Sequence, residues 1–472
     1  MSLIAATLAT ASLAIVTSDN SALRAAPRES AAQHVALSQG DMLEIRGTSL
    51  DYLKVYDHRR ERAGFVKASL VKQTRGSMDE AAELLVSLGH IRDTQGSDAL
   101  GVALFAAYAK IAPAKALDAE AFDLLGTFAE RIANRVNNAN KTQMTLAMQQ
   151  LDTAAFYGVK MKSFEIGGRI RYCYDGEAFR RVLAIAPRDA SGSLLRARAA
   201  LALTHPACID PNEHPATRRQ LESWRADVLE QVDASMLPDY MRSRIALRRA
   251  AVWSSVAFHA ARNSVEHLPA AERAVNELAK VDKQQVADED QSAHDESAVR
   301  IGAMRWMVES AAKPSTKLTI QTRAGEPGQT CVQIISPDKR VLIERCTYGV
   351  AHLNSASINA SGTAVALAVQ PLDAWRELWV FQKDNDLWRI DVLPPSSHTR
   401  DIGYVEFAGW VPGGKQLLVA REHRADGRFR KSFELLRLDT LNVEKTADAP
   451  SSINAFYRWQ DPVWKKQTVA LR

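Results

Sequence analysis

The hydrophobic periodicity of this chain changes twice, and neither a single sheet nor a single helical bundle satisfies all three stretches. Before residue 75 and after residue 316, apolar residues alternate with polar ones in short runs, as they do in half-buried strands. Between Met78 and about Ala312 the apolar residues recur at helical spacing, in segments rich in Ala, Leu, Arg and Glu. A length of 472 residues fits about three domains. We therefore expect a multidomain α+β protein with domains at 15–74, 78–312 and 316–472.

The stretch from Ala22 to Val71 predicts a small β-barrel. Leu43 and Ile45 alternate with their neighbours, Leu53 and Val55 do the same, and turns that contain glycine separate these runs. About fifty residues of short strands joined by polar turns are typical of small barrels.

The pieces of this stretch also resemble the bacterial SH3 domain, and they occur in that family's order. They are LRAAP, ALSQGDMLEIRG, DYLKVY and GFVKASLV. In that family the first piece has the pattern arginine-small-small-proline, the second is a strand that begins at Gly-Asp, the third is an aromatic-x-Lys-Val strand, and the last begins with Gly-aromatic-Val and ends with Ala-x-Leu-Val. The resemblance covers about a tenth of the chain. It implies an SH3-like barrel with an aromatic groove that binds peptide, either from the cell wall or from a protein partner.

The candidate ligand-binding residues of this barrel are Tyr52 and Tyr56, with Arg24 and His58 nearby. Aromatic faces offer a large contact area at low cost in conformational entropy, and arginine supplies charge-assisted hydrogen bonds. The alternative is that the aromatic side chains fill the barrel core. For Phe65 the core is the favoured interpretation, whereas for Tyr52 and Tyr56 both interpretations stay open.

The middle stretch predicts ten helices joined by short connections. The expected ranges are 78–91, 97–111, 118–136, 142–159, 176–186, 193–204, 215–232, 238–261, 269–280 and 293–312. Residues 175–208 resemble a tetratricopeptide-type hairpin, with Ala-Phe in the first helix and Ala-Pro at the loop. No period of about 34 residues continues beyond it. A solenoid-like all-α domain is expected, and an irregular bundle is the alternative.

The C-terminal stretch predicts an all-β domain of short strands. The expected ranges are 318–322, 331–335, 341–346, 355–359, 364–369, 377–382, 387–392, 404–410, 416–421, 432–438, 443–446, 455–459 and 468–471. Residues 355–392 and 404–446 each hold four strands, which resembles the repeat of WD-type and Tol-Pal-associated β-propellers. Only about three blades result, and closed propellers usually have at least four. We therefore expect an open propeller-like meander, or a propeller that a partner completes.

The four cysteines predict two local disulfides. Cys173 precedes the helical hairpin and Cys208 follows it, and those two ends lie side by side in an antiparallel pair. Cys331 and Cys346 flank a predicted β-hairpin whose loop places them opposite each other. Buried free thiols are the alternative for the first pair. None of the four lies in a zinc-binding pattern, so we expect no metal site.

The first residues suggest export from the cytoplasm. Residues 1–14 form an apolar run that ends in Ser12-Leu13-Ala14, an acceptable cleavage site. A charged start is missing, and the alternative is that the segment is an ordinary helix. Ile15 to Thr17 would then begin the first strand. No internal apolar run approaches the ~20 residues of a transmembrane helix. Together with an even number of cysteines, this predicts a periplasmic or secreted protein of the bacterial envelope.

The sequence indicates binding rather than catalysis. The net charge is +5 and the basic residues are scattered among acidic ones, so we expect no nucleic-acid partner. Nucleophile-elbow, P-loop, dinucleotide-binding and zinc-protease motifs do not occur, and no cofactor is expected. The single histidines are expected at the surface or as satisfied core residues; they include His205, His214, His259 and His267.

We therefore expect a non-enzymatic scaffold that holds peptidoglycan peptide or an envelope protein. The alternatives are a peptidoglycan hydrolase, or an accessory of one, and a subunit of a secretion or surface assembly. The sequence does not indicate the oligomeric state.

Overall fold

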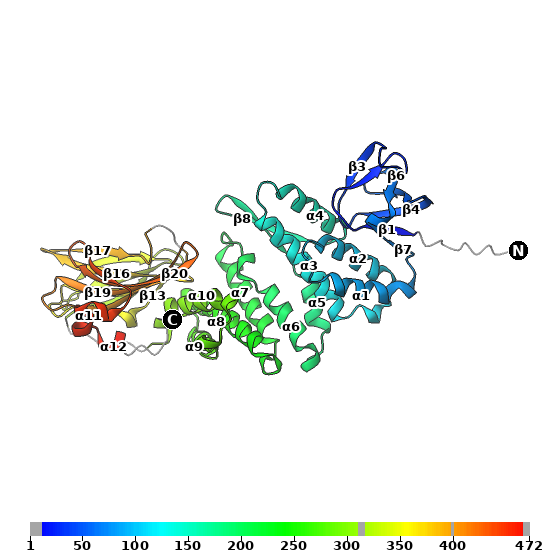
Figure 1. The fold of residues 1–472 in the computed structure, drawn as a ribbon. Helices are drawn as coiled ribbons and strands as arrows, with labels where there is room; N and C mark the ends of the chain where they lie inside the picture. The colour runs from blue at the N-terminus through cyan, green and yellow to red at the C-terminus, as the bar shows by residue number, and fades with distance from the viewer. Residues whose placement is uncertain (1–11, 310–316, 398–400, 466–472) are drawn as a thin grey trace. The chain divides into compact units, whose positions relative to one another are not determined.

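The computed structural model describes residues 12–309, 317–397 and 401–465, which form a mixed α/β protein (Figure 1). An antiparallel sheet comes first, a helical region follows, and two further sheets with two short helices complete the described part. The contacts within the chain define two compact units. The first comprises residues 1–213 and 231–236, and the second comprises residues 214–230 and 237–472. The helical region is therefore divided between the two units.

Seven antiparallel strands form the N-terminal sheet, in the order β3-β2-β6-β5-β4-β1-β7. They are β1 (Leu13–Val16), β2 (Ser21–Arg24), β3 (Gln33–Leu37), β4 (Met42–Ser49), β5 (Tyr52–Asp57), β6 (Arg62–Lys67) and β7 (Val71–Thr74). Alternate residues face inward, so Leu43, Leu53 and Val66 are buried in one core. The expectation that Phe65 lies in this core is wrong. Its neighbour Val66 takes the inward position of β6 and leaves Phe65 half-exposed.

Strand β1 begins before the predicted end of the signal segment. Ala14 and Val16 are core residues, and β1 pairs with both β4 and β7. Leu13 and Ala14 therefore belong to the sheet, and the first strand starts at Leu13 rather than at Ile15. Residues 1–11 of the predicted segment lie outside the described residues.

Six helices and a β-hairpin complete the first unit. They are α1 (Ala81–Ile91), α2 (Asp98–Ile111), α3 (Ala119–Asn138), α4 (Met144–Phe156), β8 (Met161–Ile166), β9 (Arg169–Tyr174), α5 (Glu177–Ile185) and α6 (Ala190–Leu203). Helix α3 begins after Asp118, whose carboxylate accepts a hydrogen bond from the Ala121 amide at 3.0 Å. The hairpin β8–β9 is not predicted from the sequence. Gly167 and Gly168 both have positive φ and form its two-residue turn.

Four helices begin the second unit: α7 (Pro215–Glu230), α8 (Asp239–Arg262), α9 (Leu268–Ala279) and α10 (Gln291–Met304). Phe258 of α8 and Ile301 of α10 share one hydrophobic core. Another side of α10 packs against the C-terminal sheet, where Val299 and Ala303 contact a cluster that includes Tyr404. Within the described ranges, no helix combines the length and the apolar content needed to cross a membrane.

Two sheets form the C-terminal part of the second unit. Strands β10 (Thr319–Ala324), β11 (Thr330–Ile335) and β12 (Val341–Thr347) make a three-stranded sheet. The other sheet has nine strands: β13 (Val350–Ala351), β14 (Ser357–Ile358), β15 (Ala364–Leu372), β16 (Trp375–Asp384), β17 (Leu387–Leu393), β18 (Gly403–Trp410), β19 (Gln416–Ala425), β20 (Arg428–Arg437) and β21 (Val443–Ala447). The two predicted groups of four strands join through the parallel pair β16–β18. The path from β13 to β21 does not close among the described residues.

Two short helices, α11 (Asn454–Trp459) and α12 (Pro462–Lys465), follow the last strand. The predicted strand at 455–459 is therefore wrong. Its aromatic composition favours a strand, but one turn of helix buries Phe456 against Phe433 and leaves Tyr457 81% exposed. The predicted strand at 468–471 lies outside the described residues.

Candidate functional site

Strand β5 presents two different faces. Leu53 and Val55 point into the core, so the residues at positions 52, 54 and 56 point to the opposite side. Strand β6 supplies the residues that face them across the pair. We name this surface the β5–β6 face; it consists of Tyr52, Lys54, Tyr56, Phe65 and Lys67.

One end of the β5–β6 face opens into a hollow of about 440 Å³. Tyr52 and Lys67, which are paired across β5 and β6, both line it, and Arg24 and Ser69 add further polar groups. Tyr52 is only 4% exposed, so its ring is part of the wall rather than a projecting group. This volume is within the range of sites that hold small ligands.

The hollow contains an ion pair. The Lys67 ammonium lies 3.0 Å from the Glu29 carboxylate, and this hydrogen bond lowers the pKa of Glu29 and raises that of Lys67. Arg24 is held beside them, because one of its guanidinium nitrogens donates to the Ala31 carbonyl at 3.0 Å. Its charge also lowers the pKa of Glu29. The hollow is therefore lined by two cationic side chains, Arg24 and Lys67, and by two carboxylates, Glu29 and Asp19.

A second cluster lies at the other end of the β5–β6 face. The Arg46 guanidinium lies 4.0 Å from the centre of the Tyr56 ring, and the His58 ring meets the same tyrosine edge-on at 4.8 Å. Glu44 accepts hydrogen bonds from Arg46 at 2.9 Å, and its carboxylate lies 2.8 Å from His58 Nε2. Arg46 is the main cause of the lowered pKa of Glu44. The result is a half-buried tyrosine with a cation over its ring, a surface that can contact peptide or aromatic groups.

The structure thus separates the four sequence-derived candidates into two pairs. Arg24 lies with Tyr52 at the hollow, and His58 lies with Tyr56 in the second cluster. Tyr52 and Tyr56 are four residues apart along one face of the strand, which is about 13 Å.

The sequence did not point to three charged partners, namely Glu29, Lys67 and Glu44. The strand period could have indicated Lys67, because it lies two residues after Phe65 and therefore points to the same side of β6. No such pattern indicates Glu29, since the connection between β2 and β3 brings it to Lys67.

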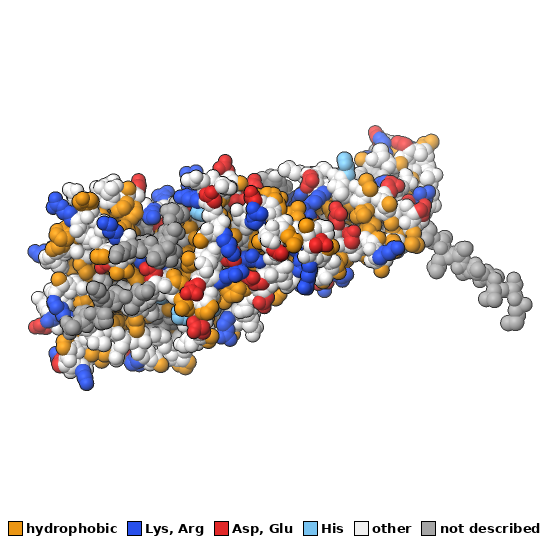
Figure 2. All heavy atoms as spheres, turned by 90° about the horizontal axis from the view of Figure 1, so that it is seen from below, with side chains coloured by type: hydrophobic (Ala, Val, Ile, Leu, Met, Phe, Trp, Pro, Cys, Tyr) orange, Lys and Arg blue, Asp and Glu red, His pale blue; other side chains and the backbone are white. Residues whose placement is uncertain are grey.

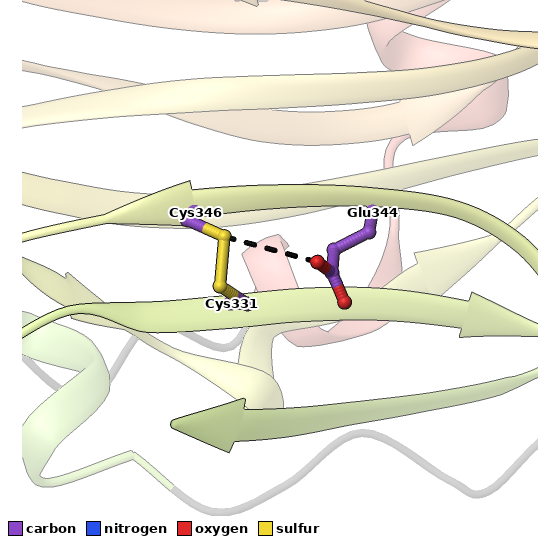
Figure 3. Close-up of side chains that lie close together, drawn as sticks. All are labelled: Cys331, Glu344 and Cys346. Carbon is purple, nitrogen blue, oxygen red and sulfur yellow. Dashed lines mark hydrogen bonds between the residues drawn. A yellow bond between two sulfur atoms is a disulfide. The ribbon is translucent and has the colours of Figure 1, made fainter. Parts of the chain in front are cut away.

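Both predicted disulfides are present. Cys173 in β9 is bonded to Cys208, with 5.7 Å between their Cα atoms. Cys331 and Cys346 are bonded directly opposite each other in the pair β11–β12. Glu344 lies beside the second disulfide, with its Oε1 4.0 Å from Cys346 Sγ (Figure 3). A metal ion would need thiolate ligands, and the two sulfurs are bonded to each other in this structure. The cluster is therefore a disulfide next to a carboxylate.

Three histidines of the helical region have local partners or are buried. The His205 and His214 rings accept hydrogen bonds from backbone amides two residues later, as helix-start groups. His259 in α8 is buried, and burial lowers its pKa. One turn before it, the Ser255 hydroxyl donates to Asp373 at 2.6 Å. Because this bond is direct, His259 does not link the serine to the carboxylate as a nucleophilic triad requires.

Charged side chains of both signs are intermixed on the face of the molecule drawn in Figure 2. Among the described residues, exposed ion pairs include Arg323 with Glu344 and Arg437 with Asp439. Exposed pairs of this kind contribute little to stability and mainly keep the surface hydrated.

Comparison with known proteins gave no relatives. No family model, no curated protein and no solved structure matches this chain. The features of this chain that point to a function are the β5–β6 face, its hollow and the two disulfides.

Proposed function

We propose that this chain is a non-enzymatic protein of the bacterial envelope whose N-terminal sheet is an SH3-like module that binds cell-wall peptide. The β5–β6 face is the observation that carries the proposal. It offers an aromatic strip with a cation-covered tyrosine at one end and a hollow with two cationic side chains at the other. A peptide lying along this strip meets aromatic surface for its apolar groups and hydrogen-bond donors for its polar ends.

The two disulfides support the envelope location. Disulfides persist in oxidising compartments such as the periplasm and are rare in the reducing cytosol. Both bonds are local, with sequence separations of 35 and 15 residues, and both hold a strand of a β-hairpin.

We further propose that the C-terminal sheets are a propeller-like scaffold for a partner protein. Strands β14 to β17 and β18 to β21 are two antiparallel groups of four, which is the strand count of a propeller blade. The open ends of the nine-stranded sheet leave strand edges for a partner to pair with. This proposal makes the protein a subunit of a surface assembly as well as a wall binder.

Cosedimentation with isolated sacculi tests the proposed function. The intact chain is expected to bind, and Tyr56→Ala is expected to bind about fivefold more weakly, because it removes the ring under Arg46. Tyr457→Ala is the matched control, since Tyr457 is an exposed tyrosine of α11 in the second unit. Absence of binding by the intact chain, or an equal loss in both variants, would remove the proposal. Clearing of a peptidoglycan gel by the purified chain would favour the hydrolase alternative.

A further inference from the structure

We infer that the hollow at the end of the β5–β6 face recognises a free carboxylate of the bound peptide, and that Glu29 occupies the same position in the free protein. This inference rests on the proposed function and names the chemical group that the site selects. It makes Glu29 an internal competitor of the ligand.

The contact between Glu29 and Lys67 has the properties that such a competitor needs. The Glu29 side chain is 76% exposed and comes from the connection between β2 and β3, 38 residues before Lys67 in sequence. Its carboxylate lies 3.0 Å from the Lys67 ammonium of β6. An exposed ion pair of this kind contributes little in water, so an incoming carboxylate can replace it at low cost.

The charges that line the hollow favour an anionic ligand group once Glu29 has moved away. Asp19 is then the remaining acid among the residues that line the hollow, and Asp51 acts on Lys67 from outside it. Both Asp19 oxygens are already engaged, one by the Gln39 amide at 2.9 Å and the other by Gln150 Nε2 at 3.1 Å. Arg24 and Lys67 are therefore the cationic groups of the hollow that a ligand can meet, and a carboxylate makes stronger hydrogen bonds to them than a neutral amide does.

Sacculi with native carboxylates and sacculi amidated with carbodiimide and ammonia provide the two probes. The intact chain is expected to bind the amidated form about three- to tenfold more weakly. Lys67→Met should reduce binding to native sacculi to a similar level. Glu29→Gln should instead increase binding to native sacculi about two- to fivefold, because the competitor is gone, and should not change binding to the amidated form.

Lys72→Met is the matched control. Lys72 has the same 37% side-chain exposure as Lys67 and pairs with a carboxylate, that of Glu83, but it lies outside the hollow. Equal binding of the intact chain to native and amidated sacculi would overturn the carboxylate inference alone, as would weaker binding by Glu29→Gln. Failure of the intact chain to bind native sacculi would instead remove the proposed function, and the carboxylate inference with it.

Discussion

His352 shows how a single side chain couples the second unit to pH. It is 4% exposed, and its Nε2 lies 3.2 Å from the Oε1 of Gln370. Burial, with a further contribution from the charge of Arg376, lowers the pKa of His352 to about 3. The ring is therefore neutral in the folded protein near neutral pH, and its Nε2–H donates to Gln370.

Acid should destabilise the second unit through His352. The unfolded chain takes up a proton at this position below pH ~6.5, whereas the folded chain does so only near pH 3. The unfolded state therefore binds more protons in this interval, and the free energy of unfolding falls as the pH decreases through it, by up to about 1.4 kcal/mol per pH unit. Urea unfolding followed by tryptophan fluorescence at several pH values measures this slope.

The variant His352→Gln should make that slope shallower, because glutamine can still donate to Gln370 but does not titrate. His58→Gln is the control, since His58 is 66% exposed on its side chain and lies in the first unit. A slope that is the same in His352→Gln and in the intact chain would contradict this assignment.

At the scale of an element, the hairpin β8–β9 is held by the side chain of a helix. The Asn137 amide of α3 donates to the Tyr172 carbonyl at 2.7 Å and accepts from the Tyr172 amide at 2.8 Å. One side chain thus makes the two hydrogen bonds that a neighbouring strand would make to β9. The next residue, Cys173, is fixed to Cys208.

Asn137→Ala should loosen β9 without unfolding the first unit. Loss of both hydrogen bonds is expected to cost about 1–2 kcal/mol locally. Hydrogen exchange of the β9 amides should become faster, while the amides of β4 and β5 keep their protection. Asn134→Ala is the control, because Asn134 lies on the exposed side of the same helix. Equal exchange of the β9 amides in both variants would contradict this role of Asn137.

The same hairpin shows why some elements are predictable from sequence and others are not. Helices such as α3 have a local apolar period and a capping residue, Asp118, so their positions can be read from the chain. Strand β8 is exposed at most positions and has no alternating apolar pattern, and Cys173 is the one fully buried residue of β9, so the hairpin has no apolar face long enough to predict a half-buried pair of strands. Their support comes from Asn137, which no local pattern indicates.

The candidate site divides in the same way. The order of short motifs predicts Tyr52 and Arg24 as candidate ligand-binding residues, and both line the hollow in the structure. No sequence pattern indicates a role for Glu29, because its carboxylate meets Lys67 through the folded path of the connection between β2 and β3. Phe65 and Val66 are adjacent and both apolar, so composition alone did not decide which one enters the core.

At the scale of the whole molecule, periodicity and packing divide the chain at different places. Periodicity changes near residue 312, where the helical pattern ends. Packing instead joins α7 to α10 with the C-terminal sheets, and Val299 of α10 is buried against them. The buried guanidinium of Arg305, just after α10, lies 3.5 Å from Glu406 of β18, and Glu406 also pairs with the buried Arg376. Helix and sheet in this unit therefore share both apolar and charged contacts.

This difference predicts how fragments of the chain will behave. A fragment of residues 1–213 retains the N-terminal sheet, α1 to α6 and the first disulfide, so it should be soluble and unfold cooperatively. A fragment that ends at Ala312 also contains α7 to α10 but lacks the sheets that cover α10. It exposes Val299 and Ala303 to water, which creates an apolar patch. It also leaves the Arg305 guanidinium without Glu406, and breaking a buried ion pair in this way is strongly destabilising.

The longer fragment should therefore bind a hydrophobic dye and aggregate on heating, whereas residues 1–213 and the complementary fragment 214–472 should not. Circular dichroism during thermal unfolding, with dye fluorescence in parallel, compares the three fragments. If the fragment ending at Ala312 melts as cooperatively as residues 1–213 and binds no more dye, then α7 to α10 are stable without the sheets. The contacts of α10 with β18 would in that case be secondary to the packing among the helices themselves.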